Sequence, residues 1–307
     1  MIKTEHLTKH YPGLTAVDDV SFQVSPGEVL GFLGPNGAGK TTTMRMLAGF
    51  IDPSAGSASI CGHDVMAAPL EAKAALGYLP EGAPLYGEMS VRGFLEFIAD
   101  LRGLAGERRA GRLKHVIEHL QLGGVLEQTI DTLSKGFRRR VGLAQAIVHD
   151  PPVLILDEPT DGLDPNQKQE VRSLIGDMAR DKIIVISTHI LEEVEAVCTR
   201  AVIIAKGRLV ADDTPAALAT RSRYHNAVSL RLEQPAQLPA ARAALAGLPE
   251  VAEVEISERD ARLTALPRAG HLILPAVSEL AARQGLKLKE LHLVSGRLDE
   301  VFRSITA

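Results

Sequence analysis

The chain has 307 residues and a hydrophobic content of 45%, which is enough for two modest globular domains, each with its own core. Its formal net charge of -4 and its pI near 6.2 give no long-range attraction for a polyphosphate backbone, so a nucleic-acid function is not expected. The N-terminus lacks the apolar core of a signal peptide, and no segment approaches the ~20 consecutive apolar residues that span a bilayer. We therefore expect a soluble, cytoplasmic chain that reaches a membrane only through a partner.

Short apolar runs alternate with helical patterns from residue 2 to about residue 211. Continuous apolar runs are typical of strands that are buried on both faces, so this alternation predicts an α/β fold with a parallel sheet covered on both sides. The predicted strands are 29–33, 153–156, 183–187 and 201–205, and the predicted helices are 41–48, 167–178 and 191–197. Between residues 91 and 122 the pattern is helical only, which predicts an inserted helical lobe at about 85–150.

The pattern changes after a predicted hairpin at Lys206-Gly207, a short helix opened by Thr214-Pro215 and a polar joint at 220–226. The segments that follow read as a strand, a helix, a hairpin, a helix and a strand, at 227–233, 237–247, 252–266, 275–284 and 286–294. This is the β-α-β-β-α-β order of a split βαβ, or ferredoxin-like, α+β domain, and a closing helix is expected at 298–305. Residues 226–307 contain ten basic and ten acidic residues, so this small domain is not expected to bind nucleic acid through its charge.

A phosphate-binding loop follows the first apolar run. The residues from Gly34 to Thr41 match G-x-x-x-x-G-K-[ST] between a predicted strand and a predicted helix, which is the context that a P-loop requires. Glycine lets backbone N–H groups turn inward around phosphate oxygens, and the start of the helix adds a positive dipole end. We expect Lys40 to reach the β- and γ-phosphates and Thr41 to ligate Mg²⁺.

Two carboxylates, Asp157 and Glu158, end the apolar run 153–156 at the edge where open α/β sheets bind ligands. Alone, such a pair could equally cap the next helix, but the P-loop upstream favours catalysis. We expect Asp157 to hold the Mg²⁺ shell. Glu158 is the candidate base that orients or deprotonates the attacking water.

The run Leu133-Ser134-Lys135-Gly136-Phe137 precedes Leu156-Asp157-Glu158-Pro159-Thr160, and in this order the motifs resemble the ABC ATPase family over residues 1–220. The resemblance implies that Tyr11 stacks on adenine, that Asp164 is the D-loop acid, and that His189 contacts the γ-phosphate. It implies a cofactor-binding set for ATP made of Tyr11, Gly34, Pro35, Asn36, Gly37, Ala38, Gly39, Lys40, Thr41, Thr42, Glu81, Ser134, Gly136 and Asp164. It further implies that Lys40, Glu158 and His189 are catalytic and that Thr41, Glu81 and Asp157 are the Mg²⁺ ligands.

Two positions depart from the family pattern. Glu81 stands where Gln is usual, which keeps an oxygen ligand but adds negative charge and loses an amide donor. In the signature loop, Lys135 and Phe137 replace Gly and Gln, whereas Ser134 and Gly136 are retained. Activity is therefore expected.

The Gly77–Glu81 segment, the signature loop and the small C-terminal domain at 226–307 resemble the ABC-2 export branch, which includes gliding-motility and drug-export ATPases. The resemblance implies a separate membrane permease as partner, a location at the cytoplasmic face of the inner or plasma membrane, and ATP-driven dimerisation as a homodimer or with a related ATPase. A regulated importer whose tail senses a ligand is the alternative. A chromosome-maintenance ATPase is disfavoured, because only 94 positions separate Lys40 from Ser134, too few for a long coiled coil.

The two cysteines and two short basic runs are expected to have structural rather than chemical roles. Cys61 and Cys198, far apart and without a Cys/His cluster, are expected to be small buried hydrophobic residues in a reducing compartment. The basic pairs and triplets at 108–109 and 138–140 are expected to be solvated helix faces.

Overall fold

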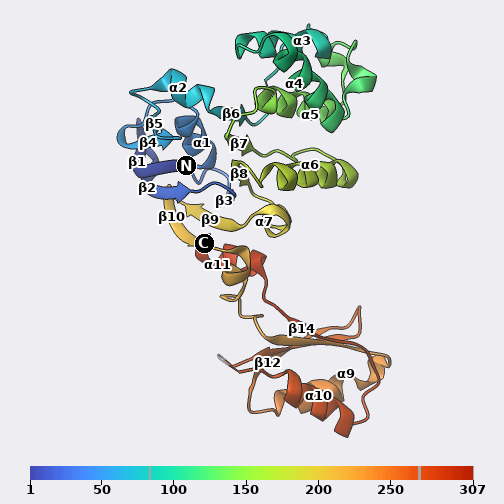
Figure 1. Ribbon diagram of the computed structural model, residues 1–307. Coiled ribbons are helices and arrows are strands. Elements are labelled where there is room, and N and C mark those ends of the chain that lie inside the picture. Colours follow the sequence, from blue (N-terminus) through green and yellow to red (C-terminus); the bar gives the residue numbers. More distant parts are fainter. Residues whose placement is uncertain (83, 269–270, 307) are drawn as a thin grey trace. The chain divides into compact units, whose positions relative to one another are not determined.

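The computed structural model describes residues 1–82, 84–268 and 271–306. The chain divides into two compact units, 1–214 and 215–305, so the helix α8 (Pro215–Ala219) belongs to the second unit (Figure 1). Within the described residues no helix combines the length and the apolar character needed to cross a membrane.

The first unit is built on a six-stranded sheet with the order β10-β9-β3-β8-β7-β6. The strands β3 (Val29–Leu33), β6 (Leu76–Leu79), β7 (Val153–Asp157), β8 (Ile183–Thr188) and β9 (Arg200–Ala205) run parallel. The edge strand β10 (Arg208–Asp213) pairs antiparallel with β9 through the hairpin predicted at Lys206-Gly207. The parallel sheet and its strands β3, β7, β8 and β9 are therefore as predicted from the apolar runs, whereas β6 was not predicted.

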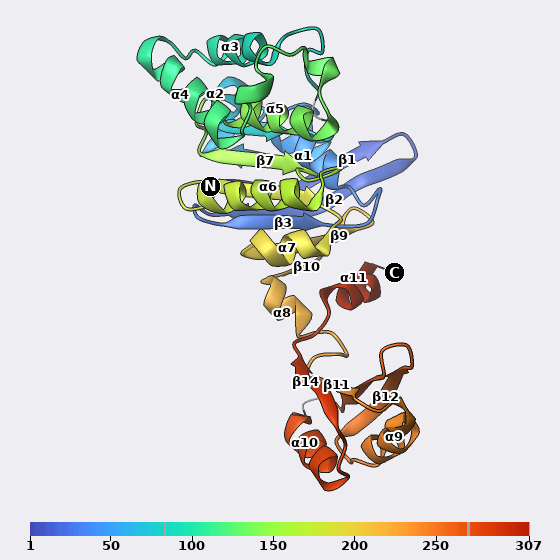
Figure 2. The same ribbon diagram turned by 90° about the vertical axis from the view of Figure 1, so that its right-hand side faces the viewer.

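Successive side chains of each central strand enter different cores, which explains why the runs are continuous rather than alternating. On β7, Leu154 and Leu156 pack in a core with residues of α5 (Lys135–Ile147) and α6 (Pro165–Met178). Val153 and Ile155 pack in the other core with residues of α1 (Lys40–Leu47). Figure 2 shows α5 and α6 against the sheet, and α7 (Leu191–Val197) follows β8.

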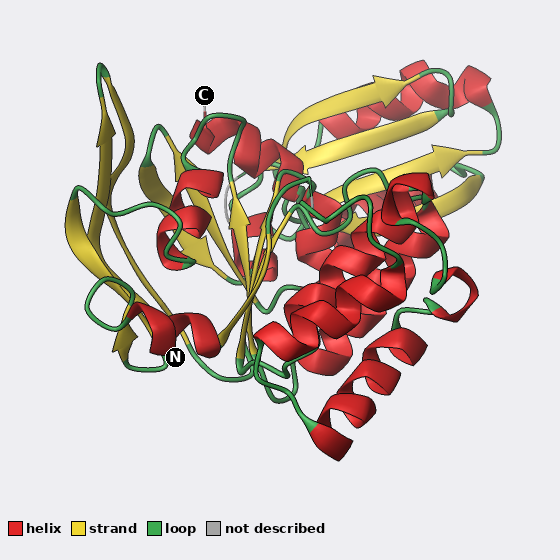
Figure 3. Cartoon of the chain, turned by 90° about the horizontal axis from the view of Figure 1, so that it is seen from above, coloured by secondary structure: helices red, strands yellow, loops and turns green. Residues whose placement is uncertain are grey.

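A second, antiparallel sheet with the order β2-β1-β4-β5 was missed by the sequence analysis. It consists of β1 (Ile2–Tyr11), β2 (Leu14–Val24), β4 (Ala55–Ile60) and β5 (His63–Asp64). Its buried side chains, such as Ile2 and Val17, join the core that also contains residues of α1. In Figure 3 these strands and the large group of helices lie on different sides of the parallel sheet.

The helical lobe lies between β6 and β7. It contains α3 (Val91–Leu101), α4 (Gly106–His119) and α5, with 3₁₀ turns at Gly123–Val125 and Ile130–Thr132. The short helix α2 (Pro69–Ala74) precedes β6 and lies outside the lobe. Helix α3 begins at a Ser90 N-cap, whose hydroxyl accepts the N–H of Gly93. The inserted lobe is therefore as predicted from the helical pattern.

After α8, the second unit follows the order β11, α9, β12, β13, α10, β14 and α11. The strands are β11 (Ala227–Leu232), β12 (Val251–Ser257), β13 (Arg262–Pro267) and β14 (Leu288–Val294). The helices are α9 (Leu238–Ala246), α10 (Leu274–Arg283) and α11 (Leu298–Thr306), and a 3₁₀ turn at Pro235–Gln237 precedes α9. All its pairs are antiparallel, in the sheet order β12-β13-β11-β14. Residues of α9 and α10 share one core with β11 and β13, so this unit has a hydrophobic core of its own.

Two structural interpretations made from the sequence are wrong. Cys61 is exposed in the turn between β4 and β5, where its φ of 51° places it in the left-handed region, whereas Cys198 is partly buried. Arg139 and Arg140 are buried rather than solvated, because α5 is covered on more than one side. Arg138, between Phe137 and Arg139, is exposed as expected.

Candidate functional site

The P-loop connects β3 to α1, and two of its glycines are required by close backbone approach. A Cβ on Gly34 would lie 2.5 Å from the carbonyl oxygen of Ile204, and one on Gly39 would lie 2.4 Å from that of Ala16. Gly37 and Gly39 also have φ values of 78° and 106°, which favour glycine. Gly39, the N-cap of α1, has no side chain that could cap the helix, so this helix start is available to an anion.

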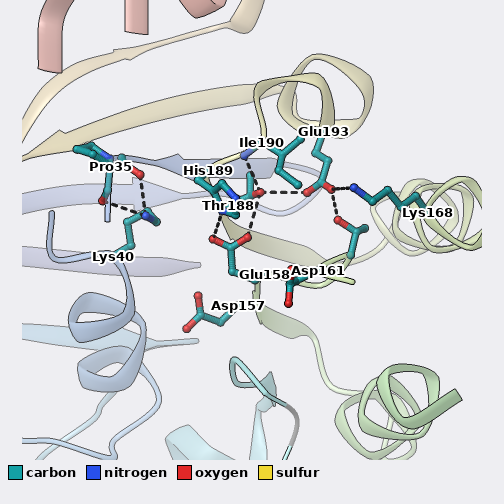
Figure 4. Close-up of polar contacts among 12 residues, drawn as sticks. Pro35, Lys40, Asp157, Glu158, Asp161, Lys168, Thr188, His189, Ile190 and Glu193 are labelled. Carbon is teal, nitrogen blue, oxygen red and sulfur yellow. Dashed lines mark hydrogen bonds and ion pairs between the residues drawn. The ribbon is translucent and has the colours of Figure 1, made fainter. Parts of the chain in front are cut away.

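Lys40, the first residue of α1, is buried and folds back over the loop. Its Nζ donates to the carbonyl oxygens of Gly34 at 2.7 Å and Pro35 at 3.1 Å (Figure 4). Burial lowers the pKa of Lys40, and the charges of Glu158 and Asp157 oppose that change. The ammonium group therefore lies in the loop that is built for phosphates.

Asp157 ends β7 with a carboxylate that is 1% exposed. Neither carboxylate oxygen has a hydrogen-bond partner within the described part of the chain. Burial raises the pKa of Asp157 and Glu81 adds to the effect, while the nearby hydroxyl groups of Ser187 and Thr41 oppose it. An unpartnered buried carboxylate is costly, so this position indicates a ligand site for a cation.

Glu158 stands at a strained backbone position with a φ of 50°, next to the end of β8. Its N–H donates to the carbonyl oxygen of Ser187 at 2.8 Å. Its Oε1 lies 2.9 Å from Nδ1 of His189, whose side chain is half exposed. Burial raises the pKa of Glu158, and the hydrogen bond and charge of His189 oppose the rise. The structure thus brings together the predicted base and the predicted histidine.

Behind this pair lies a buried carboxylate that the sequence analysis missed. Glu193 of α7 is 2% exposed, and its oxygens accept the hydroxyl groups of Thr160 and Thr188, the latter at 3.0 Å. Nζ of Lys168 lies 3.9 Å away. A signal was present in the sequence, since Glu193 falls among apolar residues on the inward side of a short helix.

Arg139 is the second residue that was missed. Its guanidinium group donates to the carbonyl oxygens of Pro80, Asp157, Glu158 and Pro159, the first at 3.3 Å and the second at 2.5 Å. Burial lowers its pKa, and the charge of Asp161, followed by Asp157, opposes that change. The side chain thus connects α5 to the ends of β6 and β7. The sequence does not predict its burial, because Arg139 is the middle residue of three consecutive arginines.

The other predicted residues lie on separate elements. Tyr11 ends β1 and is 42% exposed, with Nζ of Lys9 5.3 Å from its ring centroid. Glu81 is exposed beyond the end of β6, and Asn36 is exposed in the P-loop, while Thr42 is partly buried on α1. In the part of the chain that the structure describes, Tyr11 and Glu81 form no hydrogen bond with P-loop residues.

Ser134 and Asp164, which are predicted to bind ATP, each cap a helix in the structure. The hydroxyl of Ser134 accepts the N–H of Phe137 at the start of α5. Asp164 forms a reciprocal capping box with Gln167 at the start of α6. Gly136 is buried beneath Gln167, whose Oε1 would lie 2.5 Å from a Cβ at that position. The two caps thus fix the starts of α5 and α6, while the side chains of Ser134 and Asp164 remain exposed to solvent.

A P-loop after one strand of a parallel sheet, with a buried aspartate and a glutamate at the end of a nearby strand, defines a P-loop nucleotide-binding ATPase. The carboxyl ends of β3, β7 and β8 deliver Lys40, Glu158 and His189 to one edge. This is the edge at which open α/β sheets bind ligands.

Comparison with known proteins agrees with this class. Residues 17–161 match the family model described as ABC transporter. The whole chain is 32% identical to the uncharacterized ABC transporter ATP-binding protein YhcH of Bacillus subtilis (strain 168), over 96% of that protein. It is 39% identical to the Nod factor export ATP-binding protein I of Paraburkholderia xenovorans (strain LB400), over 71% of this chain and 72% of that protein.

A solved structure has the same fold. The dimeric structure of a post-hydrolysis state of the ATP-binding cassette MJ0796, bound to ADP and Pi, matches with a TM-score of 0.65 at 20% identity. The match covers 70% of this chain and 99% of that one. The chain therefore belongs to the ABC transporter family, as an ATP-binding subunit with the α/β fold of an ABC ATPase domain.

Proposed function

We propose that this chain powers export through a separate membrane permease of the ABC-2 type. In this proposal it hydrolyses ATP as a dimer at the cytoplasmic face of the membrane. The observation that carries the catalytic part is the grouping of Lys40, Glu158 and His189 at one sheet edge. The export direction is supported by the identity with a Nod factor export ATP-binding protein.

Glu158 acts as the base or orienting group for the attacking water, and His189 holds it through Oε1. Lys40 leaves the carbonyl oxygens of Gly34 and Pro35 for the β- and γ-phosphates, since a charged phosphate oxygen is a better acceptor than a neutral carbonyl. The chemistry of phosphoryl transfer depends on positioning and charge stabilisation, and these three residues supply both.

The oxygen-rich edge of the sheet fits Mg²⁺. Asp157 offers two buried oxygens without hydrogen-bond partners in the described residues, and the hydroxyl of Thr41 lies close enough to lower the pKa of that carboxyl. We assign Asp157, Thr41 and Glu81 to the ion, which prefers oxygen ligands. When bound, Mg²⁺ neutralises negative charge on the β- and γ-phosphates.

A dimer is proposed because Ser134 and Asp164 are exposed at capped helix starts, away from the P-loop of their own chain. Each would then serve a nucleotide held by the partner subunit. The partner would be a second copy or a related ATPase. The dimeric form of MJ0796 supports this arrangement at the level of the fold.

A permease contact is proposed for an exposed apolar surface on the helical lobe, formed by Tyr86, Phe97 and Leu101. The ring of Tyr86 lies 5.8 Å from that of Phe97 and 6.1 Å from that of Phe94. Clustered exposed aromatic side chains are typical of interaction sites. Tyr86 lies five positions after Glu81 in the sequence.

For the tail we propose a ferredoxin-like domain at about 226–307 that acts in dimer contact or regulation. Support comes from its strand order and from its separate core. Within the described residues no group of three or more His, Cys, Asp or Glu side chains could hold a metal ion. A tethering role would raise the effective concentration of one ATPase domain at the other.

The catalytic proposal is tested by Glu158→Gln, which keeps the shape and removes the charge. We expect this variant to bind ATP and to lose hydrolysis by at least about a hundredfold. Bound ATP should then hold two subunits together, since ATP binds the closed dimer selectively. Sedimentation with saturating Mg-ATP should show a dimer for Glu158→Gln and a shorter-lived one for the unmodified chain.

The matched control is Glu195→Gln, the same change at an exposed site on α7. It should leave hydrolysis and sedimentation unchanged. Hydrolysis by Glu158→Gln at the rate of the control would show that Glu158 is not the base.

A further inference from the structure

The carboxylate of Glu193 lies in an environment that is unusual for a charged residue on a helix of seven residues. It is 2% exposed, and its hydrogen-bond partners come from two other segments of the chain. Oε1 accepts the hydroxyl of Thr160, two residues after Glu158, and Oε2 accepts the hydroxyl of Thr188, directly before His189 (Figure 4). Burying a carboxylate costs free energy, so a site that retains one requires a reason beyond packing.

The hydrogen bonds of Thr188 show what Glu193 controls. The Thr188 hydroxyl has one hydrogen and two acceptors within reach, Oε2 of Glu193 at 3.0 Å and Oε2 of Glu158 at 3.5 Å. The shorter distance assigns the hydrogen to Glu193. The hydroxyl oxygen in turn accepts the N–H of Ile190 at 3.1 Å, so the hydroxyl is fixed on both sides.

Two consequences for the base follow from this assignment. Oε2 of Glu158 receives no hydrogen from Thr188 and keeps its lone pairs for a water molecule, while Oε1 is held by His189. The bond from Ile190 to Thr188 also fixes the peptide that carries His189. Glu193 therefore acts on both members of the Glu158–His189 pair without touching either.

Lys168 explains how the buried charge is tolerated. Its Nζ lies 3.9 Å from Oε1 of Glu193, and its side chain, at 27% exposure, is largely covered. Lys168 follows Gln167, which belongs to the capping box of α6. The charge of Glu193 is thus balanced from a third element of the same unit.

We infer that Glu193 is a positioning residue for hydrolysis, which orients the Thr188 hydroxyl and thereby aligns Glu158 and His189. This inference rests on the proposed role of Glu158. It predicts that removing the charge of Glu193 slows the chemical step and leaves ATP binding intact. A residue that only stabilised the fold would instead lower the melting temperature, with kcat per folded molecule unchanged.

The first test measures ATP binding and steady-state hydrolysis on the full chain with Glu193→Gln. An amide keeps one acceptor oxygen and adds a donor, so the Thr188 hydrogen is free to turn to Glu158. We expect kcat to fall by about ten- to a hundredfold, as for other small misplacements of a reacting group. The KM and the Kd for ATP should change by less than about twofold, the pattern of an interaction that matters in the transition state. Glu195→Gln, on the same helix but exposed, is the matched control.

The second test uses Thr188, because Glu193→Gln alone could also disturb folding. Thr188→Val removes the hydroxyl at nearly constant shape and should reproduce the loss in kcat, whereas Thr188→Ser retains the hydroxyl and should restore most of it. The double variant Glu193→Gln/Thr188→Val should lose no more than the worse single variant, since both changes break one chain of contacts.

Four results separate the possible failures. If Glu193→Gln matches Glu195→Gln in kcat, or if the two losses multiply in the double variant, Glu193 does not act through Thr188 and the inference is overturned. Equal losses for Thr188→Val and Thr188→Ser would overturn it too. Should Glu158→Gln itself hydrolyse ATP normally, the assignment of the base fails first.

Discussion

Replacement of Arg139 by methionine should have a large consequence for the first unit, because this buried side chain contacts four carbonyl oxygens. Methionine has a similar length and no hydrogen-bond donor. The substitution removes the cation that serves the carbonyl oxygens of Pro80, Asp157, Glu158 and Pro159. Because Asp157 and Glu158 are held by their backbone oxygens, both stability and hydrolysis should decrease.

The magnitude follows from the three donating nitrogens. A hydrogen bond to a charged group contributes about 1.5–3 kcal/mol, so three give a gross loss of about 5–9 kcal/mol. Two effects reduce this figure. Arg139 lines a cavity of about 310 Å³, from which water can reach some carbonyl oxygens, and the buried guanidinium no longer has to be desolvated. We expect a net loss of about 3 kcal/mol in the free energy of unfolding.

The assay is scanning calorimetry on the full chain. The transition that ATP raises belongs to the first unit, since a ligand stabilises the unit that binds it. For a unit of this size a loss of about 3 kcal/mol lowers the melting temperature by about 6–12 °C. Arg138→Met, the exposed neighbour, should change the free energy by less than about 0.5 kcal/mol. Arg139→Lys should lie between the two, because lysine keeps the charge but not the planar fork.

A difference of less than about 3 °C between Arg139→Met and Arg138→Met would refute this reasoning. It would mean that water replaces the guanidinium group at all four carbonyl oxygens. The hydrolysis rate of the folded variant provides an independent check, because rehydrated carbonyls could keep the stability while Glu158 loses its alignment.

Two further predictions concern pH and the tail. Burial lowers the pKa of His149 to about 4, so the unfolded chain, with a histidine pKa near 6.5, takes up the proton first as the pH falls. His149 therefore stabilises the fold above pH 6.5 and loses that contribution towards pH 4. The wild-type free energy of unfolding should drop by about 2 kcal/mol more than that of His149→Gln between pH 7 and pH 5, and parallel pH curves in urea titrations would contradict the assignment. Truncation after Thr214 should change the affinity for ATP by less than about twofold. It should raise the protein concentration at which the ATPase rate is half-maximal, because the tether is lost. A truncated chain that is folded but no longer binds ATP would show instead that the tail is part of the nucleotide site.

The parallel sheet could be predicted because its strands are buried on both faces. Runs such as Val153–Asp157 carry apolar residues into two cores at once, and this leaves a continuous signal. The antiparallel sheet gave no such signal, because β1 is interrupted by register shifts in its pairing with both β2 and β4. Its partner β4 is also distant in the sequence, and such pairings are not visible in a local pattern.

At the candidate site, the residues within sequence motifs were predictable, whereas the residues that support them were not. Lys40 and Glu158 stand in motifs whose spacing follows from phosphate chemistry. Glu193 and Arg139 act through backbone carbonyls and hydroxyl groups of other segments, and such contacts exist only after the chain has folded. Charged residues on helices are mostly exposed, so burial of these two could not be assumed from their type.

The different surroundings of the two cysteines make the unmodified chain suitable for selective labelling. Cys61 is exposed in the turn after β4, where a reagent can approach. Burial raises the pKa of the Cys198 thiol to about 12, and its sulfur packs under Gly31, where a Cβ would lie 2.9 Å away. Since the thiolate is the reactive form, a maleimide dye at neutral pH should attach to Cys61 and spare Cys198. Cys61 therefore provides a single site for a fluorophore on the first unit. Energy transfer between labelled subunits could report their association without any engineered residue.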